Sequence, residues 1–400
     1  MVQKRTLPMG TLLLLISFAS VNAVLPTPGL HQIAVFFQQS EQSVQILMTG
    51  FLWGYAFGQL LYGPLANYFG RKPAIYIGLF LQLLSCLLCI ASGKLYQFNL
   101  LVLARFLMAL GSGVGLKMTF TLVNEYCDGK TAAAKTAWLV LGFAFIPGIM
   151  VSISGLLIAQ FSWFAAFYLA FAYGMLLLLM AWKLPETLPT HVKNALQWKN
   201  ILKNYGKTLC NPGLISGAVT MGSATCFIYL YATLSPLISI GMYGMNSASY
   251  GLFNLIPTIG LVIGCLLSAK MGPKIGMVAS LIWGCLQSAV AISMMGIALY
   301  LQLGILYGLF IPMAFLNIGL SFIVANAPSI VLNTISDKSN ASAMLNFINM
   351  GMAALLISAT QKVIPSLLNF SLLFLGILTV LLCASGFTVK TVQSIRPSTA

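Results

Sequence analysis

The chain has very few charged residues and almost no acidic ones. Only 6% of its 400 residues are charged, and just five are Asp or Glu. A soluble domain usually carries about 25% charged residues, so this sequence lacks the polar surface that would keep it in water. Hydrophobic residues make up 59% of the chain. This composition indicates a helical protein that crosses a membrane many times and contacts lipid over its outer surface.

Histidine is also scarce, and the sequence has no recognisable metal or catalytic site. The two histidines, His31 and His191, are not positioned with other metal ligands. Eight cysteines are scattered through hydrophobic segments, and the closest pair, Cys86 and Cys89, has no His or acidic neighbour. We interpret them as small buried apolar residues. Because no nucleotide-binding loop or nucleophile–base pair is recognisable either, we expect neither an enzyme nor a cofactor.

Long hydrophobic runs predict twelve membrane spans. Each has the roughly 20 mainly apolar residues that crossing a bilayer requires. Their approximate bounds are 7–25, 44–65, 73–93, 98–123, 135–158, 161–182, 212–240, 247–269, 275–298, 301–327, 340–361 and 366–389. The first run also resembles a signal peptide that ends in VNA at residues 21–23. We expect this helix to be retained, since its removal would leave eleven spans and reverse the orientation.

The basic residues predict how the spans are oriented. Lys and Arg in short loops favour the cytoplasmic side of a membrane. With the N-terminus inside, sixteen of them fall on the cytoplasmic side, and only Lys94 and Lys362 fall outside. This bias places both termini in the cytoplasm. It also accounts for the net charge of +15 without nucleic acid as a partner.

A polar stretch at residues 184–210 divides the chain after the sixth predicted span. It predicts an N-terminal bundle at 1–183 and a C-terminal bundle at 211–400, joined by a cytoplasmic linker. Residues 191–207 of this stretch could form a basic amphipathic helix on anionic lipid, or simply a solvated tether. A weak repeat supports the division, because GCLLSAKMGPKIG after span eight echoes GPLANYFGRKP after span two. Parallel repeats of this kind occur in transporters.

Short motifs in a fixed order point to a known family. Residues 58–73 read GQLLYGPLANYFGRKP, an apolar segment followed by a compact basic turn. Further matches follow along the chain: RFLMALG (105–111), FIPGIMVSISGLL (145–157), Trp163 with LPETL (184–188), Ser235-Pro236, and YGLF (250–253). In this order and spacing the motifs resemble the major facilitator superfamily, and more closely its 12-span drug-resistance branch of the Bcr/CflA type.

The resemblance implies both a fold and a function. The family fold is an all-α membrane protein, in which two pseudo-symmetric six-helix bundles rock about a central cavity. We therefore expect a monomeric secondary transporter of the bacterial inner membrane, surrounded by lipid. It would export a small organic molecule by alternating access, coupled to protons. Alternatives on the same scaffold are a transporter of a specific metabolite, nutrient or anionic siderophore with altered coupling, and a receptor that does not transport.

The sequence departs from the family where the family carries charge. Asn22 stands where an aspartate usually precedes the Leu-Pro pair of span one, and Asn67 stands where loop 2–3 usually has an aspartate. Asn124 and Glu125 replace the usual Arg-Asp of span four. The acidic residues all fall in predicted loops or at helix ends: Glu41, Glu125, Asp128, Glu186 and Asp337. Proton coupling usually relies on a buried carboxylate, so these departures weaken the expectation of coupling to protons.

Two cations and three polar residues are the candidate contacts for substrate or coupling. Arg105 and Lys117 lie about 18 Å apart along span four and about 120° apart around it, so we do not expect them to share one site. Arg105 either bonds backbone carbonyls or contributes to coupling, and Lys117 either extends toward the cytoplasm or binds an anion. Spans one, four, seven and ten line the cavity of this fold, which favours Asn22, Tyr229 and Asn317 as contacts. A cavity that contains cationic side chains but no carboxylates would favour neutral or anionic substrates.

The loop between spans two and three is the candidate conformational gate. The resemblance assigns this role to Gly63, Asn67, Gly70, Arg71 and Lys72, together with Glu125 at the inner end of span four. A structural role for Glu125, as an interfacial partner of Lys130 or of this loop, is the simpler alternative. The other asparagines of the spans are interpreted as helix-to-helix hydrogen bonding: Asn254, Asn326, Asn346 and Asn349.

Overall fold

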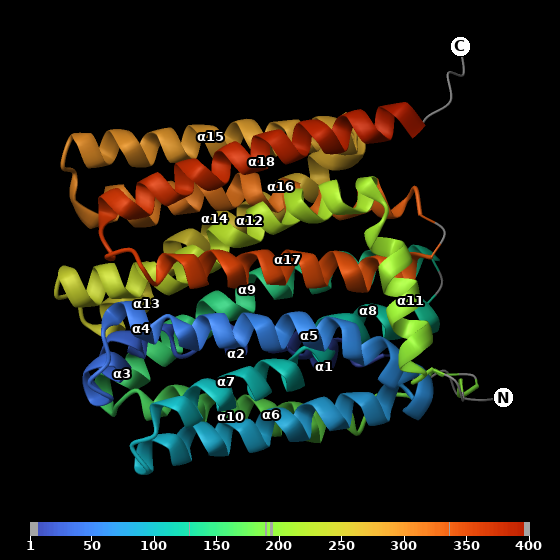
Figure 1. The fold of residues 1–400 in the computed structure, drawn as a ribbon, viewed down its shortest axis with the longest axis horizontal. Coiled ribbons are helices and arrows are strands. Elements are labelled where there is room, and N and C mark those ends of the chain that lie inside the picture. The colour runs from blue at the N-terminus through green and yellow to red at the C-terminus, as the bar shows by residue number, and fades with distance from the viewer. Residues whose placement is uncertain (1–6, 128, 189, 193–194, 336, 396–400) are drawn as a thin grey trace.

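The computed structural model describes residues 7–127, 129–188, 190–192, 195–335 and 337–395. All regular secondary structure in these ranges is helical (Figure 1). Within the described ranges, eleven helical segments are long and apolar enough to cross a membrane. A helix pair at Met9–Ile16 and Phe18–Phe36, bent by 44°, brings the number of candidate spans to twelve. The predicted all-α membrane fold with its hydrophobic spans is confirmed.

The spans follow the sequence in order. In the first half of the chain they are formed by α1 (Met9–Ile16) with α2 (Phe18–Val24), α5 (Ile46–Phe69), α6 (Arg71–Lys94), α7 (Phe98–Ser112) with α8 (Val114–Tyr126), α9 (Gly129–Gln160) and α10 (Phe164–Ala181). In the second half they are formed by α12 (Pro212–Pro236) with η2 (Leu237–Met242), α13 (Ser247–Phe253) with α14 (Leu255–Ile275), α15 (Met277–Tyr300), η3 (Leu306–Phe310) with α16 (Ile311–Leu332), α17 (Lys338–Thr360) and α18 (Leu367–Ile395).

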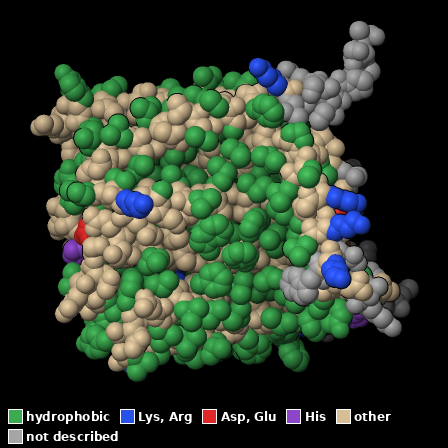
Figure 2. Space-filling model, viewed as in Figure 1, with side chains coloured by type: hydrophobic (Ala, Val, Ile, Leu, Met, Phe, Trp, Pro, Cys, Tyr) green, Lys and Arg blue, Asp and Glu red, His purple; other side chains and the backbone are tan. Residues whose placement is uncertain are grey.

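Short helices connect these spans. Helices η1 (Thr27–Gly29) and α3 (Leu30–Phe36) follow α2 to the end of the bent first span, α4 (Glu41–Val44) begins the second span ahead of α5, and α11 (Trp198–Leu209) lies between the two halves. Helix α11 runs across one end of the bundle, roughly perpendicular to the spans, and the described chain begins and ends at that same end (Figure 1). Hydrophobic side chains are spread over the whole long face, whereas most of the visible Lys and Arg lie toward the α11 end (Figure 2).

Two glycines occupy equivalent turns in the two halves. Gly70 joins α5 to α6 with φ 109° and ψ 162°, and Gly276 joins α14 to α15 with φ 84° and ψ 160°. Positive φ at this point favours glycine because a Cβ would be strained there. The weak sequence echo between the two loops therefore corresponds to the same backbone turn. The bundle boundaries at residues 183 and 211 stay a prediction.

Glycines also bring α5 close to the fourth span. A Cβ on Gly113, at the junction of α7 and α8, would lie 3.2 Å from the Cα of Gly58 in α5. Small residues at such positions let two helix backbones approach closely in a membrane. The two helices are therefore closely packed at this point.

Candidate functional site

A cavity of about 1250 Å³ lies between the two halves of the chain. Its lining includes residues of α1, α2 and α8 from the first half and of α12 and α16 from the second. Thus spans one, four, seven and ten all contribute, as the family resemblance implied. Helices α5, α9, α14 and α17 line it as well. The volume is sufficient for a drug-sized molecule.

The cavity is open toward the end of the bundle that carries α11. Its lining residues Asn124, Glu125 and Lys338 at that end are exposed, whereas Thr27 and Tyr250 at the opposite end are buried. Hydrogen bonds between the halves close the opposite end. They run from Ser152 Oγ to Gly251 O (2.7 Å), from Ser247 Oγ to Pro28 O (2.9 Å) and from Thr360 Oγ1 to Gln45 Oε1 (3.0 Å).

Lys117 is the one charged residue in the interior of the described cavity lining. The other charged lining residues, Glu125 and Lys338, lie exposed at its mouth. Along α8, Lys117 is about 12 Å deeper than Glu125. Neither of the ion pairs between described residues includes Lys117, and no hydrogen bond to another described residue holds its Nζ. The side chain lies across Gly63, where a Cβ would come within 2.5 Å of Nζ.

Arg105 lies outside the cavity and bonds the backbone near the end of α2. It is only 1% exposed. Its Nη1 donates to the carbonyl of Asn22 (2.7 Å), its Nη2 donates to the carbonyl of Ala23 (3.1 Å), and its guanidinium lies 4.3 Å from the ring centre of Phe51. The Asn22 carbonyl is available because Pro26, four residues later, has no N–H to donate to it. This geometry matches the backbone-carbonyl alternative for Arg105.

The Asn22 side chain also points away from the cavity lining. Its Nδ2 donates to the carbonyl of Phe18 (2.8 Å), and its Oδ1 accepts from Gln82 Nε2 (3.0 Å). Asn22 is fully buried in this cluster. Asn22 and Arg105 therefore form one polar cluster behind the first span, and Lys117 lies apart from it, as the helical periodicity predicted. Their expected role in coupling stays a prediction, and neither contacts the cavity.

Tyr229 and Asn317 do line the cavity. The Nδ2 of Asn317 donates to the carbonyl of Pro257 (2.9 Å), which ties α16 to α14, while its Oδ1 has no partner among the described residues. Asn317 thus combines a helix-to-helix bond with a free acceptor. Of the five expected substrate or coupling residues, the structure brings Lys117, Tyr229 and Asn317 to one cavity.

The remaining asparagines differ from the expected helix-to-helix bonding. Only Asn254 shows it, since its Oδ1 accepts from the hydroxyl of Tyr231 at 3.1 Å. Asn326 and Asn346 instead donate to carbonyls four residues earlier in their own helices. Asn349 has no hydrogen-bond partner among the described residues. Short amide side chains can satisfy their donors within their own helix, which the sequence pattern does not distinguish from bonding across helices.

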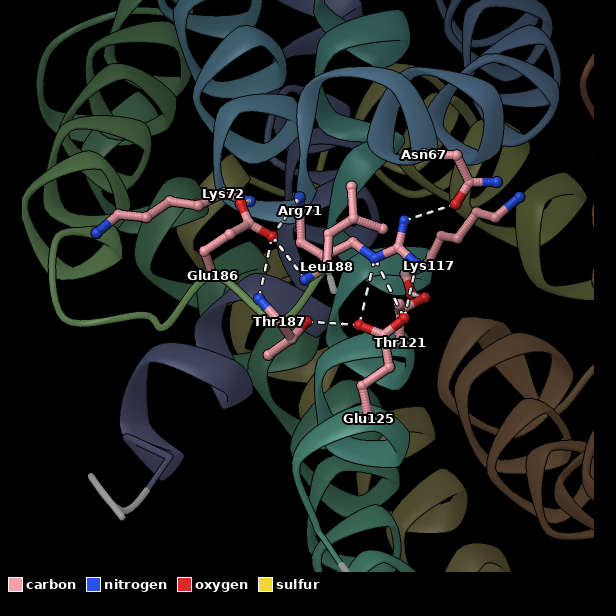
Figure 3. A network of polar contacts seen from close by, with 9 residues as sticks. All are labelled: Asn67, Arg71, Lys72, Lys117, Thr121, Glu125, Glu186, Thr187 and Leu188. Atoms are coloured by element: carbon pink, nitrogen blue, oxygen red, sulfur yellow. Dashed lines mark hydrogen bonds and ion pairs between the residues drawn. The ribbon is translucent and has the colours of Figure 1, made fainter. Parts of the chain in front are cut away.

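The candidate gate residues form one network at the open end (Figure 3). Arg71 Nη2 pairs with Glu125 Oε1 at 2.6 Å, and Arg71 Nη1 donates to Asn67 Oδ1 at 2.7 Å. Thr187 Oγ1 donates to the other oxygen of Glu125. Asn67 therefore supplies a neutral acceptor to Arg71 and leaves Glu125 as its charged partner. This pairing is the structural role that the sequence offered for Glu125, as a partner of loop 2–3.

Glu186 caps the first turn of α6 from a distant part of the chain. Its carboxylate accepts hydrogen bonds from the backbone N–H groups of Arg71 (2.9 Å) and Lys72 (3.0 Å), and from those of Thr187 and Leu188 (3.0 Å each). Partial burial of the Glu186 carboxyl favours its neutral form, but these four N–H groups outweigh that effect and lower its pKa below the usual 4.5.

The conformation of the Gly70 turn makes room for this cap. A Cβ on Gly70 would lie 2.7 Å from Glu186 Oε2, so a larger residue would displace this carboxylate, and the positive φ also favours glycine. The side chain of Lys72 takes no part in the network, because its Nζ donates to the carbonyl of Trp182 at 2.8 Å. Glu186 and Thr187 also belong to the gate network, although the sequence did not predict them there. Their position in LPETL, a motif of the family, was the available indication.

Comparisons with known proteins agree with this architecture. The model of the Major Facilitator Superfamily matches residues 9–359. A bicyclomycin resistance protein homolog of Haemophilus influenzae is 26% identical over 319 residues, which cover 79% of this chain and 76% of that protein. Multidrug resistance protein D of Escherichia coli is 23% identical over 303 residues, which cover 74% and 73% of the two chains.

A solved structure shares the fold. The xylose transporter XylE of Escherichia coli, in a partially occluded inward-open conformation, matches with a TM-score of 0.72 at 15% identity. The match covers 96% of this chain and 98% of that chain. At this identity the likeness concerns the fold alone. The family model, the relatives and the cavity between two sets of spans together show that the chain belongs to the Major Facilitator Superfamily and is a membrane transporter.

Proposed function

We propose that the protein exports a small neutral or anionic organic molecule across the bacterial inner membrane by alternating access. The observation that supports this most is the cavity between the two halves, whose interior contains one unpaired ammonium group, that of Lys117. The drug-resistance relatives support efflux as the direction. Expected partners are the substrate and the surrounding lipid, and we expect the transporter to act as a monomer.

The charge of the cavity supports the choice of substrate. An unpaired ammonium group in an apolar cavity attracts an anion and repels a lipophilic cation. The described cavity interior has no carboxylate that could offset Lys117, because Glu125 lies at the mouth and is paired with Arg71. A cationic drug would therefore be disfavoured at this position.

The proposed orientation places the open end of the cavity in the cytoplasm. The positive-inside rule favours this, because the α11 end carries the basic loops predicted to lie inside. A substrate would then enter from the cytoplasm. The network of Arg71, Asn67 and Glu125 borders this opening, and we propose that it makes and breaks contacts as the opening closes.

The positions of the acidic residues give little support for coupling to protons. The described acidic residues, Glu41, Glu125, Glu186 and Asp337, lie in loops or at helix ends, and the position next to Arg105 is the amide Asn22. This observation favours a second candidate, a transporter of a specific metabolite or anionic siderophore with altered coupling.

Flux into proteoliposomes tests these alternatives. We expect the wild type to transport organic anions, and Lys117→Ala to lower that flux at least tenfold while changing the flux of neutral compounds little. An imposed pH gradient should drive the wild type weakly and Asn22→Asp more strongly, because an aspartate restores a group that can carry a proton. Tight binding of cationic dyes with no effect of organic anions would refute the proposed substrate class. Ligand binding without flux under any gradient would indicate a receptor.

A further inference from the structure

Two buried amides line the cavity without partners. Gln59 of α5 is 2% exposed and Asn349 of α17 is fully buried, and both belong to the cavity lining. Among the described residues, no group bonds Gln59 Nε2 or either polar atom of the Asn349 side chain. Leaving a buried amide unpaired costs about 1–3 kcal/mol, so such groups are normally bonded to protein or to a bound molecule.

The packing of α5 against α17 places these amides in order along the cavity. Two contacts set an antiparallel register between the helices: Trp53 on Gly351, and Phe57 on Phe347. This register brings Tyr55 of α5, another lining residue, level with Asn349. Gln59 follows Tyr55 by four residues, which is one helical turn or about 6 Å toward the open end.

The ammonium group of Lys117 lies further along the same row of residues, one turn beyond Gln59 toward the open end. Its Nζ lies against Gly63, and Gly63 follows Gln59 by one further turn of α5, again about 6 Å. Along about 12 Å the cavity wall therefore presents an aromatic ring, unpaired amides and a cation. This order runs from the closed end toward the open end.

We propose that Gln59, Asn349 and Lys117 form a binding site for an organic anion that carries an amide or hydroxyl group next to an aromatic or apolar part. The anionic group binds Lys117, the amide or hydroxyl exchanges hydrogen bonds with Gln59 and Asn349, and the apolar part packs near Tyr55. A primary amide both donates and accepts, so it matches groups that do the same. The inference rests on the proposed function and names the substrate class of that cavity.

The cavity wall also contains an amide whose donor is bonded within its own helix, besides Asn317, which keeps one free acceptor. Asn326 also lines the cavity, and its Nδ2 donates to the carbonyl of Phe322 at 2.8 Å. It therefore provides a matched control: the same residue type in the same cavity, already bonded within its own helix.

Binding of three related probes to the purified protein in lipid nanodiscs tests the site. N-acetylphenylalanine has the carboxylate, the amide and the ring; 3-phenylpropanoate lacks the amide, and N-acetylphenylalanine amide lacks the charge. By calorimetry we expect the wild type to bind the first probe at least tenfold more tightly than either of the others. Gln59→Met and Asn349→Leu should remove the preference over 3-phenylpropanoate, and Lys117→Met should remove the preference over the neutral amide. Asn326→Leu should keep both preferences.

Thermal unfolding of the same variants gives an independent check. Because the two amides have no protein partner, apolar residues of similar shape should leave the melting temperature unchanged or raise it. A clear fall in melting temperature for Gln59→Met and Asn349→Leu, beyond that for Asn326→Leu, would show that the amides are bonded within the protein and would overturn the site.

The outcomes also separate this site from the proposed function. Equal binding of the three probes by the wild type, or a preference that survives both amide substitutions, overturns the site even if proteoliposomes transport other compounds. Selective binding that depends on Gln59 and Asn349, without flux in proteoliposomes, supports the site and refutes export.

Discussion

At the scale of single residues, buried Arg105 is held by neutral groups. Its guanidinium bonds the carbonyls of Asn22 and Ala23 and stacks on Phe51, and no carboxylate among the described residues pairs with it. The carbonyl of Asn22 is free to accept such a bond because Pro26, four residues later, has no backbone N–H to donate to it. In this protein the arginine therefore bonds the backbone near the end of α2, whatever it contributes to coupling.

Replacing Arg105 should destabilise the protein strongly. Arg105→Leu would leave two buried carbonyls unpaired, and each costs about 1–3 kcal/mol, so we expect a loss of about 3 kcal/mol and a lower melting temperature in detergent. Arg105→Lys keeps the charge and some donors and should lose less. A melting temperature of Arg105→Leu equal to that of the wild type would show that these bonds contribute little.

At the scale of elements, the first turn of α6 depends on a residue more than a hundred positions away. The Glu186 carboxylate accepts from the N–H groups of Arg71 and Lys72, which are left without partners at the start of the helix. A negative charge at a helix N-terminus is favourable as well. The first residues of the polar stretch that joins the two halves (184–210) are thus hydrogen-bonded to the candidate gate.

Removing the charge of Glu186 should give a stability loss that depends on pH. Its pKa is lowered in the folded protein, so its stabilisation is complete above pH 4.5 and disappears as the pH falls through the folded pKa. Glu186→Gln should therefore have a lower melting temperature than the wild type at neutral pH. The corresponding loss in the free energy of unfolding should be about 1 kcal/mol. The two curves should converge in acid. A difference in melting temperature that is constant with pH would contradict the capping role.

The sequence predicted elements better than it predicted which way their side chains face. Hydrophobic length located the spans, and the motifs located the turn at Gly70. The sequence did not show that Asn22 faces Gln82 or that Asn349 faces the cavity, because membrane helices are apolar on nearly every side. It also did not pair Glu186 with α6, since that contact depends on how distant segments pack. The sequence did single out Lys117, which lines the cavity, because charge within a predicted span is rare and costly.

At the scale of the whole molecule, the two ends of the cavity differ. Exposed lining residues such as Asn124 and Lys338 mark the end near α11, and hydrogen bonds such as Ser247 to Pro28 join the halves at the other end. During its cycle, a transporter that works by alternating access must close the end that is open and open the end that is closed. The gate network at Arg71 and Glu125 lies where the open end would have to close.

Side-specific labelling of single cysteines tests alternating access most directly. In a background with the eight native cysteines replaced by serine, Thr121→Cys reports on the cavity near its open end and Thr27→Cys on the closed end. We predict that a membrane-impermeant thiol reagent modifies Thr121→Cys from the cytoplasmic side at rest. It should modify Thr27→Cys from the outside only when N-acetylphenylalanine is being transported. Reaction of Thr121→Cys from the outside alone, or rates at both positions that substrate does not change, would contradict the account.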